Sequence, residues 1–292
     1  MIKTYRSFAK INLFLYVLGR RNDGYHDLWS LMTRIDLYDD IWFDFDSRDI
    51  SVSCSHPDVP EDGSNLAVKA AGLFYQTLKS VAKDVHQGVF MQINKRIPPG
   101  GGLGGGSSNA ATVLMALNEY YNRPFTTQTL MKIGLQLGAD VPFFIFGKPA
   151  VAKGVGEQLE SVDNLKPYHL VLCDPGVAAS TASVYKNIDF RLTLNQKDNI
   201  KFGLNVPLRG QEFEVGACLH NDLEESACRL YPKIRETKEE MALLLRQKVF
   251  MTGSGSSLFS LFSDLKDARN GFDCLSKKWA GSNRTVFLSS FI

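Results

Sequence analysis

Cysteine is scarce in this 292-residue chain, and its pattern excludes a disulfide scaffold. The five cysteines are scattered and odd in number, with no C-x-x-C pair, so we expect reduced thiols in a cytosolic protein. The Cys/His pairs, Cys54 with His56 and Cys218 with His220, have a spacing that does not favour a metal site. We therefore assign no residue of the chain as a metal ligand.

Strong charge and long apolar runs are also absent. A net charge of +2 gives no reason to expect nucleic acid or an acidic membrane surface as a partner. No apolar run is long enough to span a bilayer, and the N-terminus lacks the features of a signal peptide. The length suggests about two domains. We expect a cytoplasmic protein that is a monomer or a weak homodimer.

Glycine is concentrated in one stretch, Pro98–Ala111, which holds six glycines. Because glycine loses more backbone entropy than any other residue when it is ordered, this density indicates that the backbone closely approaches a ligand. Ser107 and Ser108 are expected to cap the amphipathic helix that follows. A glycine loop that leads into a helix N-terminus is an anion site, and polyphosphate suits a loop of this length.

Neither of two familiar glycine motifs fits this loop. Gly100, Gly102 and Gly105 satisfy G-x-G-x-x-G, but no strand runs straight into the loop and no acidic residue follows at the required distance. The P-loop spacing is nearly met, yet Ser107 stands where lysine is required. Phosphate charge must then be met by Mg²⁺, the helix dipole or a cation from elsewhere. A flexible linker is the alternative, but two prolines before the loop and a helix directly after it argue against a linker.

Three polar residues lie in otherwise apolar segments. Lys10 and Asn12 share one face of the expected strand Phe8–Val17, which indicates a site unless that face is a solvated sheet edge. Asp140 precedes Pro142, which suits the first turn of a helix, so Asp140 is expected at or near the helix N-cap. Capping is the simpler role for Asp140, and it is compatible with catalysis.

A turn signal at Arg21–Gly24 predicts a β-hairpin. Tyr25 and His26 follow at its exit, where they could hold a planar ligand by stacking and hydrogen bonding. An ordinary exposed Tyr–His pair is the alternative.

The remaining periodicity predicts an α+β fold. Further strands are expected in 31–45, 50–54, 89–93, 169–173, 258–262 and 285–288, a hairpin in 151–157, and helices in 65–81, 126–137, 221–228, 232–245 and 265–277.

Taken together, these features resemble the GHMP kinase superfamily. The resemblance rests on Phe8–Leu13, Gly100–Ala111 and Thr252–Ser257, and it is more specific, through Arg21–His26 and Gly138–Pro142, to the branch that phosphorylates diphosphocytidyl-methylerythritol in non-mevalonate isoprenoid synthesis. It implies a two-domain GHMP kinase fold, with a ribosomal-protein-S5-like N-terminal domain in 1–160, a ferredoxin-like C-terminal domain in 161–292, and ligands between them. It also implies a small-molecule kinase that uses ATP and Mg²⁺.

The resemblance further implies a role for each candidate residue. Asp140 is the base for the 2-hydroxyl of the acceptor, and Lys10 keeps that carboxylate ionised and stabilises negative charge. The ATP-binding residues are Pro98, Pro99, Gly100, Gly101, Gly102, Leu103, Gly104, Gly105, Gly106, Ser107 and Ser108, with Asn65 and Leu66 bordering the adenine. The substrate-binding residues are Asn12, Tyr25, His26 and Tyr185, of which Tyr25 and His26 recognise the cytosine.

Two other functions remain open. The first is a GHMP kinase for another small alcohol, such as mevalonate or homoserine. The Tyr25-His26 pair argues against it, because an aliphatic substrate offers nothing to stack. The second is a catalytically silent nucleotide or metabolite sensor, against which the presence of both Lys10 and Asp140 argues.

Overall fold

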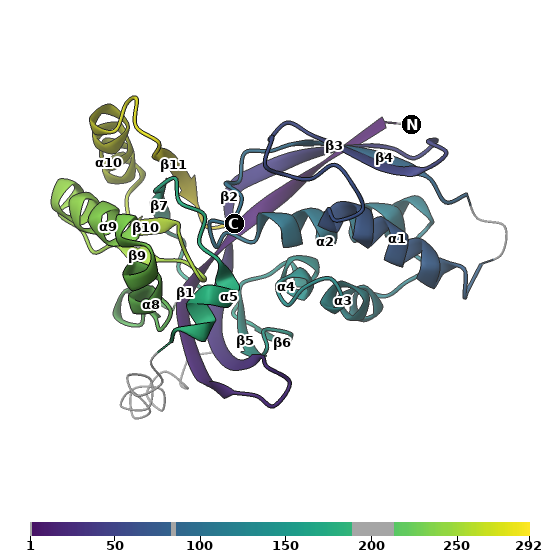
Figure 1. The fold of residues 1–292 in the computed structure, drawn as a ribbon, viewed down its shortest axis with the longest axis horizontal. Helices are drawn as coiled ribbons and strands as arrows, with labels where there is room; N and C mark the ends of the chain where they lie inside the picture. Colours follow the sequence, from purple (N-terminus) through teal and green to yellow (C-terminus); the bar gives the residue numbers. More distant parts are fainter. Residues whose placement is uncertain (1, 83–85, 189–212) are drawn as a thin grey trace. The chain divides into compact units, whose positions relative to one another are not determined.

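The computed structural model describes residues 2–82, 86–188 and 213–292, and Figure 1 shows its ribbon. The chain forms two compact units. Two long strands, β1 (Ile2–Arg20) and β2 (His26–Asp44), contribute residues to both of them. Unit 1 comprises Met1–Ala9, Leu37–Pro99 and Gly104–Gly147, and unit 2 comprises Lys10–Asp36, Gly100–Leu103 and Lys148–Ile292. The predicted α+β class is confirmed, and the division at residue 160 stays a prediction.

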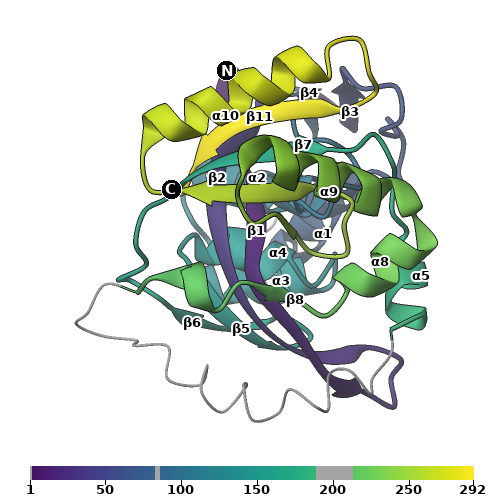
Figure 2. The ribbon, with the colours of Figure 1, turned by 90° about the vertical axis from the view of Figure 1, so that its left-hand side faces the viewer.

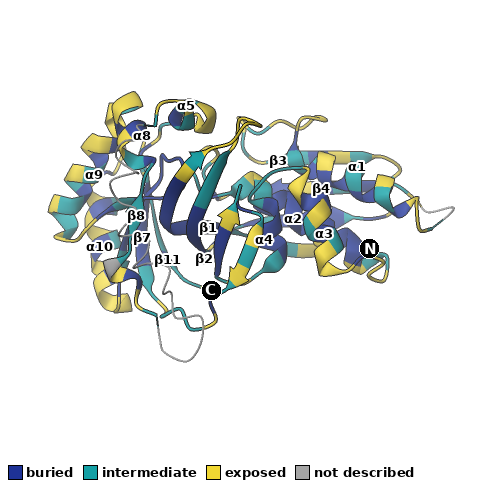
Figure 3. Cartoon of the chain, turned by 90° about the horizontal axis from the view of Figure 1, so that it is seen from below, coloured by how far each residue is buried: buried dark blue, intermediate teal, exposed yellow. Residues whose placement is uncertain are grey.

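Unit 1 packs helices against strands. In it β2 pairs antiparallel with β4, which pairs parallel with β3. The helix α2 is largely buried (Figure 3), because small and apolar residues occupy most of its circumference. The other elements besides β1 and β2 are β3 (Ile50–Cys54), β4 (Val89–Asn94), α1 (Leu66–Leu78), α2 (Gly105–Tyr120), α3 (Thr127–Leu135) and α4 (Val141–Phe146).

Unit 2 contains a four-stranded sheet in the order β11-β7-β10-β9. Figure 2 shows α9 and α10 covering one face of this sheet. Its core joins β7 and β10 to these helices through residues such as Val171, Leu258, Met241 and Leu275, all of which are fully buried. The bounds are β5 (Ala150–Gly154), β6 (Gln158–Ser161), β7 (His169–Asp174), α5 (Thr181–Lys186), a 3-10 turn (Val215–Ala217), β8 (His220–Asn221), α8 (Glu224–Leu230), α9 (Pro232–Leu245), β9 (Phe250–Met251), β10 (Leu258–Phe262), α10 (Leu265–Lys278) and β11 (Thr285–Ser290).

The predicted hairpin after Arg20 is confirmed. The Arg21 amide donates to the Tyr25 carbonyl over 2.8 Å, and Gly24 adopts a φ of +86°, a conformation that glycine reaches at low cost. Most other predicted elements are present within a few residues. The helix predicted at 221–228 begins only at Glu224, after the short β8. The helix α5, the short strand β9 and the 3-10 turn at Val215–Ala217 were not predicted.

Among the helices of the described residues, none is long and apolar enough to cross a membrane.

Candidate active site

The glycine loop ends in a helix that no side chain caps. The helix α2 begins at Gly105, its N-cap residue is Gly104 with a φ of +70°, and no side chain bonds to its first amides. The prediction that Ser107 or Ser108 caps this helix is wrong. Glycine adopts the left-handed cap conformation that serine disfavours, so the helix starts before both serines. A helix N-terminus without a side-chain cap presents its N–H groups to an external anion.

Ser107 and Ser108 lie within the first turn of α2 and have different neighbours. The Ser108 hydroxyl is buried and accepts a hydrogen bond from the Ser7 hydroxyl over 2.8 Å. Ser107 lies beside the segment that leads to Asp140, because a Cβ on Gly138 would come within 3.7 Å of the Ser107 Oγ. Unit 1 therefore brings the start of α2 near the start of α4, although the two are about 30 residues apart in the sequence.

Asp140 stands at the N-cap of α4, with Pro142 in the first turn, as the sequence predicted. Its side chain makes no capping hydrogen bond, and the residue is half-buried. The side chain therefore does not cap α4, and a catalytic role for Asp140 stays a prediction.

Asn65 and Leu66 begin α1 beside the same loop. The Leu66 Cδ1 lies 3.4 Å from the position of a Cβ on Gly106. Asn65 accepts a hydrogen bond from the Ala67 amide and donates one to the Pro60 carbonyl over 2.6 Å. Both polar atoms of the Asn65 side chain thus take part in fixing the helix start, and Leu66 supplies apolar surface next to the loop.

Unit 2 holds Lys10 and Asn12 in its interior. Their side chains are 3% and 5% exposed, and the Lys10 Nζ donates to the Asn12 Oδ1 over 2.6 Å. The alternative of a solvated sheet edge is therefore wrong. Two hydroxyl groups hold Asn12 further. The Ser30 hydroxyl accepts a hydrogen bond from the Asn12 side-chain Nδ2 over 2.8 Å, and the Thr252 hydroxyl accepts one from the Asn12 backbone amide over 2.9 Å.

Ser30 and Thr252 are site residues to which the sequence reasoning assigned no role. Ser30 is 3% exposed and lies on the paired strand β2. Its hydroxyl donates to the Phe14 carbonyl over 2.7 Å, so it orients the Asn12 carboxamide from a fixed position. The sequence feature that could have indicated Ser30 is its position as a small polar residue among the apolar residues of β2.

The second glycine loop, Thr252–Ser257, contacts the middle of the first. A Cβ on Gly102, which has a φ of +76°, would lie 2.4 Å from the Thr252 carbonyl oxygen. The Ser257 amide donates to the Gly101 carbonyl over 3.1 Å, and the Lys10 Nζ lies 3.4 Å from the position of a Cβ on Gly253. These close approaches exclude side chains, which explains why both segments are rich in glycine.

Two of the three predicted aromatic and imidazole residues lie together in unit 2. The rings of His26 and Tyr185 stack with their centroids 5.1 Å apart and an interplanar angle of 29°. Burial, helped by the charge of Arg20, lowers the pKa of His26 below its usual value, so the imidazole is neutral at physiological pH. Tyr25 is 61% exposed at the hairpin tip, and no ring contact joins it to His26 or Tyr185 in the described part of the chain.

Within residues 2–82, 86–188 and 213–292, no group of three or more His, Cys, Asp or Glu side chains is placed to hold a metal ion.

Family models match both parts of the chain. The model described as GHMP kinases N terminal domain matches residues 65–148, and the model described as GHMP kinases C terminal matches residues 209–281. With the glycine loop, the helix start at Gly105 and the buried Lys10–Asn12 pair, these matches define a GHMP kinase. The resemblance inferred from the motifs is confirmed.

The chain belongs to the 4-diphosphocytidyl-2-C-methyl-D-erythritol kinase family. It is 43% identical over 272 residues to the kinase of that name from Syntrophotalea carbinolica, with 92% of this chain and 93% of the relative covered. It is 44% identical over 263 residues to the kinase from Geobacter sp. strain M21, with 89% and 90% covered. A crystal structure of 4-(cytidine 5'-diphospho)-2C-methyl-D-erythritol kinase superposes with a TM-score of 0.74 at 31% identity and covers 99% of each chain.

Proposed function

We propose that this protein transfers the γ-phosphoryl group of ATP to the 2-hydroxyl of 4-diphosphocytidyl-2-C-methyl-D-erythritol, yielding the 2-phosphate and ADP. The reaction belongs to non-mevalonate isoprenoid precursor synthesis in the cytoplasm. The observation that carries this proposal is the 43% identity over nearly the whole chain to a kinase of that name. The geometry of each unit supports it.

The first glycine loop and the start of α2 bind the ATP phosphates in this proposal. The first-turn N–H groups of α2 have no side-chain cap, so they can donate to phosphate oxygens along the helix dipole. Leu66 packs beside Gly106 and borders the adenine. Mg²⁺ enters bound to ATP as part of the substrate, and it neutralises the charge that develops on the transferred group.

Asp140 and Lys10 act on the reacting groups. Asp140 accepts the proton of the 2-hydroxyl from its position at the start of α4. Such general-base assistance contributes about 10²–10⁴-fold to a rate. Lys10, whose ammonium is buried and oriented by Asn12, stabilises negative charge. A buried cation acts more strongly than an exposed one, because water does not screen it.

The cytidyl group binds to unit 2 in this proposal. His26 and Tyr185 supply a preformed stack, and the neutral imidazole of His26 can both donate and accept a hydrogen bond at a cytosine edge. Tyr25 is exposed at the hairpin tip, where it can close over a planar base. Asn12 keeps a second hydrogen on Nδ2, beyond the one donated to Ser30, for the acceptor substrate.

Release of ADP by the purified protein tests this function. The protein is incubated with Mg-ATP and, separately, diphosphocytidyl-methylerythritol, mevalonate, homoserine or no acceptor. Turnover with the cytidyl substrate alone is the expected result. Turnover with mevalonate or homoserine would agree with the assignment of the phosphate loop and would show that the assignment of the cytosine site is wrong. No turnover with any acceptor, despite ATP binding, would favour a sensor.

A further inference from the structure

Asp39 is a buried carboxylate that none of the roles above uses. It lies on the inward face of β2, in the alternating series Ile35, Leu37, Asp39, Ile41 and Phe43, and its exposed fraction is 0%. A carboxylate in an apolar layer is costly unless its oxygens are fully hydrogen-bonded. The hydrogen-bond partners of Asp39 therefore indicate what this carboxylate does in the fold.

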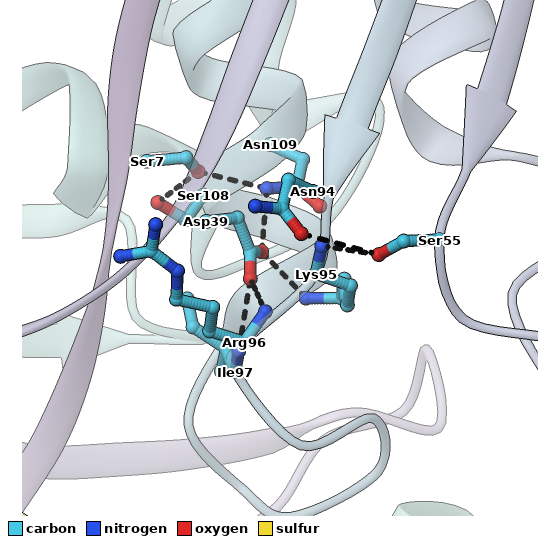
Figure 4. Close-up of polar contacts among 9 residues, drawn as sticks. All are labelled: Ser7, Asp39, Ser55, Asn94, Lys95, Arg96, Ile97, Ser108 and Asn109. Carbon is cyan, nitrogen blue, oxygen red and sulfur yellow. Dashed lines mark hydrogen bonds and ion pairs between the residues drawn. The ribbon is translucent and has the colours of Figure 1, made fainter.

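Four donors surround the Asp39 carboxylate (Figure 4). Its Oδ1 accepts from the backbone amides of Arg96 over 2.8 Å and Ile97 over 2.9 Å. Its Oδ2 accepts from the Lys95 Nζ over 2.6 Å and the Asn109 Nδ2 over 2.9 Å. Both oxygens thus have two partners each, and Lys95 balances the charge.

The four donors come from the two segments that flank the first glycine loop. Lys95–Ile97 directly precede Pro98, and Asn109 is the fifth residue of α2, just after the loop. Asn109 also donates to the Ser7 hydroxyl over 2.9 Å, which in turn donates to Ser108. One carboxylate therefore ties the segment before the loop to the helix after it.

The loop between these segments has few means of holding its own shape. Its six glycines carry no side chains, and an unrestrained glycine segment samples many backbone conformations. Lys95 adds a steric element, because its Nζ lies 2.8 Å from the position of a Cβ on Gly105. Its ammonium therefore packs directly against the first residue of α2.

We propose that Asp39 is a positioning residue for the nucleotide: it holds the start and end of the glycine loop at the separation at which the loop and α2 amides surround the ATP phosphates. Asp39 acts through Lys95–Ile97 and Asn109 and does not touch the nucleotide itself. This inference rests on the proposed function, since it takes the loop to be the ATP-phosphate site.

The central test is the steady-state kinetics of Asp39→Asn. The substitution keeps the shape of the side chain but puts an N–H₂ group where the Lys95 and Asn109 donors require an acceptor. We expect the KM for ATP to rise about 10- to 100-fold, as for the loss of one or two well-placed contacts, while the KM for the acceptor stays within about twofold. Asp40→Asn is the matched control, because Asp40 pairs with the exposed Arg96 guanidinium over 2.6 Å. An ATP KM within twofold of the parent protein's in folded Asp39→Asn would overturn the inference.

A second pair of variants covers the case in which Asp39→Asn does not fold. Asn109→Ala removes one donor from the cluster, whereas Asn118→Ala removes a buried side chain farther along α2 that bonds the Phe125 backbone. Both should lower the urea midpoint, but only Asn109→Ala should raise the ATP KM. A purely structural role would give equal KM values for the two variants and would overturn the inference.

Hydrogen exchange separates this inference from the proposed function. In nucleotide-free protein, Asn109→Ala should speed exchange of the amides in residues 100–109 relative to Asn118→Ala, whether or not the protein is a kinase. If Asn109→Ala speeds exchange in the loop but the parent protein shows no ATP turnover, the Asp39 cluster still positions the loop and the proposed function is wrong. Unchanged exchange in an active enzyme would refute the positioning role alone.

Discussion

The Lys10 ammonium donates to the Asn12 carboxamide oxygen over 2.6 Å, and both side chains are almost fully buried. The two residues are adjacent on one face of β1, and Asn12 is itself held by Ser30 and Thr252. A buried ammonium acts on a nearby negative charge more strongly than an exposed one, because water screens it less. This arrangement favours a role for Lys10 in stabilising transferred phosphate.

Lys10→Met should lower kcat by about 10²–10³-fold, as for the loss of one preorganised charged donor. The ATP KM should change much less, because the loop amides remain in place. Lys3→Met is a suitable control, since Lys3 lies on the same strand and forms an exposed pair with Glu119 over 3.1 Å. Equal kcat values for Lys10→Met and Lys3→Met would show that Lys10 has no catalytic role.

Asp140→Asn should reduce turnover by about 10²–10⁴-fold, because asparagine cannot accept the hydroxyl proton. Nucleotide affinity should be retained. The urea midpoint of the variant, measured in parallel, separates a loss of turnover from a loss of folding. Turnover and Mg-ATP titration on one preparation check both expectations, and near-normal turnover would show that the base assignment is wrong.

Tyr185→Ala should raise the KM for the cytidyl substrate about 2- to 10-fold through loss of the stack with His26, a contribution of about 0.5–1.5 kcal/mol. Tyr185→Phe should preserve the stack and most of the affinity. The ATP KM serves as the internal reference, because Tyr185 belongs to the acceptor side of the proposal. A shift in the ATP KM instead of the acceptor KM would place Tyr185 at the nucleotide.

The acceptor KM should depend on pH through His26. Burial, helped by the charge of Arg20, lowers the pKa of His26 below its usual value, so the imidazole is neutral at physiological pH and becomes charged only at a lower pH than is usual for histidine. The KM should be flat around physiological pH and should rise in more acidic solution. His26→Gln should abolish this rise, and an unchanged profile in that variant would exclude His26 as its origin.

Above pH 8, the free energy of unfolding should fall because of three thiols, of which two are buried and one, that of Cys218, is half-buried. Burial raises the pKa of Cys173 to about 12 and those of Cys218 and Cys228 to about 11. In the unfolded chain these thiols lose their protons near pH 9, so the unfolded state releases protons that the folded state retains. Their stabilising contribution is complete below about pH 8 and is lost as pH rises toward 11. Urea midpoints measured between pH 8 and 10 report this loss of stability. The midpoint of the triple Cys→Ala variant should fall less steeply with pH.

The sequence predicted elements whose signal is local. Pro232 starts α9 and the run Leu258–Phe262 forms β10 where expected, because proline and β-branched or aromatic periodicity act within a few residues. The cap of α2 was missed, since choosing Gly104 over Ser107 depends on the left-handed conformation of one residue.

The polar cluster at Asp39 was missed for a different reason. Asp39 alternates with the buried Leu37 and Ile41 along β2, but the sequence analysis assigned it no role, and its donors lie more than 50 residues away in sequence. Their proximity depends on tertiary contacts, such as the pairing of β2 with β4 next to Lys95. The partners of a buried polar residue therefore cannot be read from the local pattern.

The order of synthesis matters because the two units interleave along the chain. All segments of unit 1 have been made once residue 147 is translated, whereas unit 2 needs residues 10–36 together with residues 148–292. The apolar strand segments in 10–36 therefore emerge early from the ribosome and wait for most of translation before their C-terminal partners exist. Until β5, which pairs with β2, and then β8, which pairs with β1, have been made, these strands have unpaired edges that are prone to aggregation.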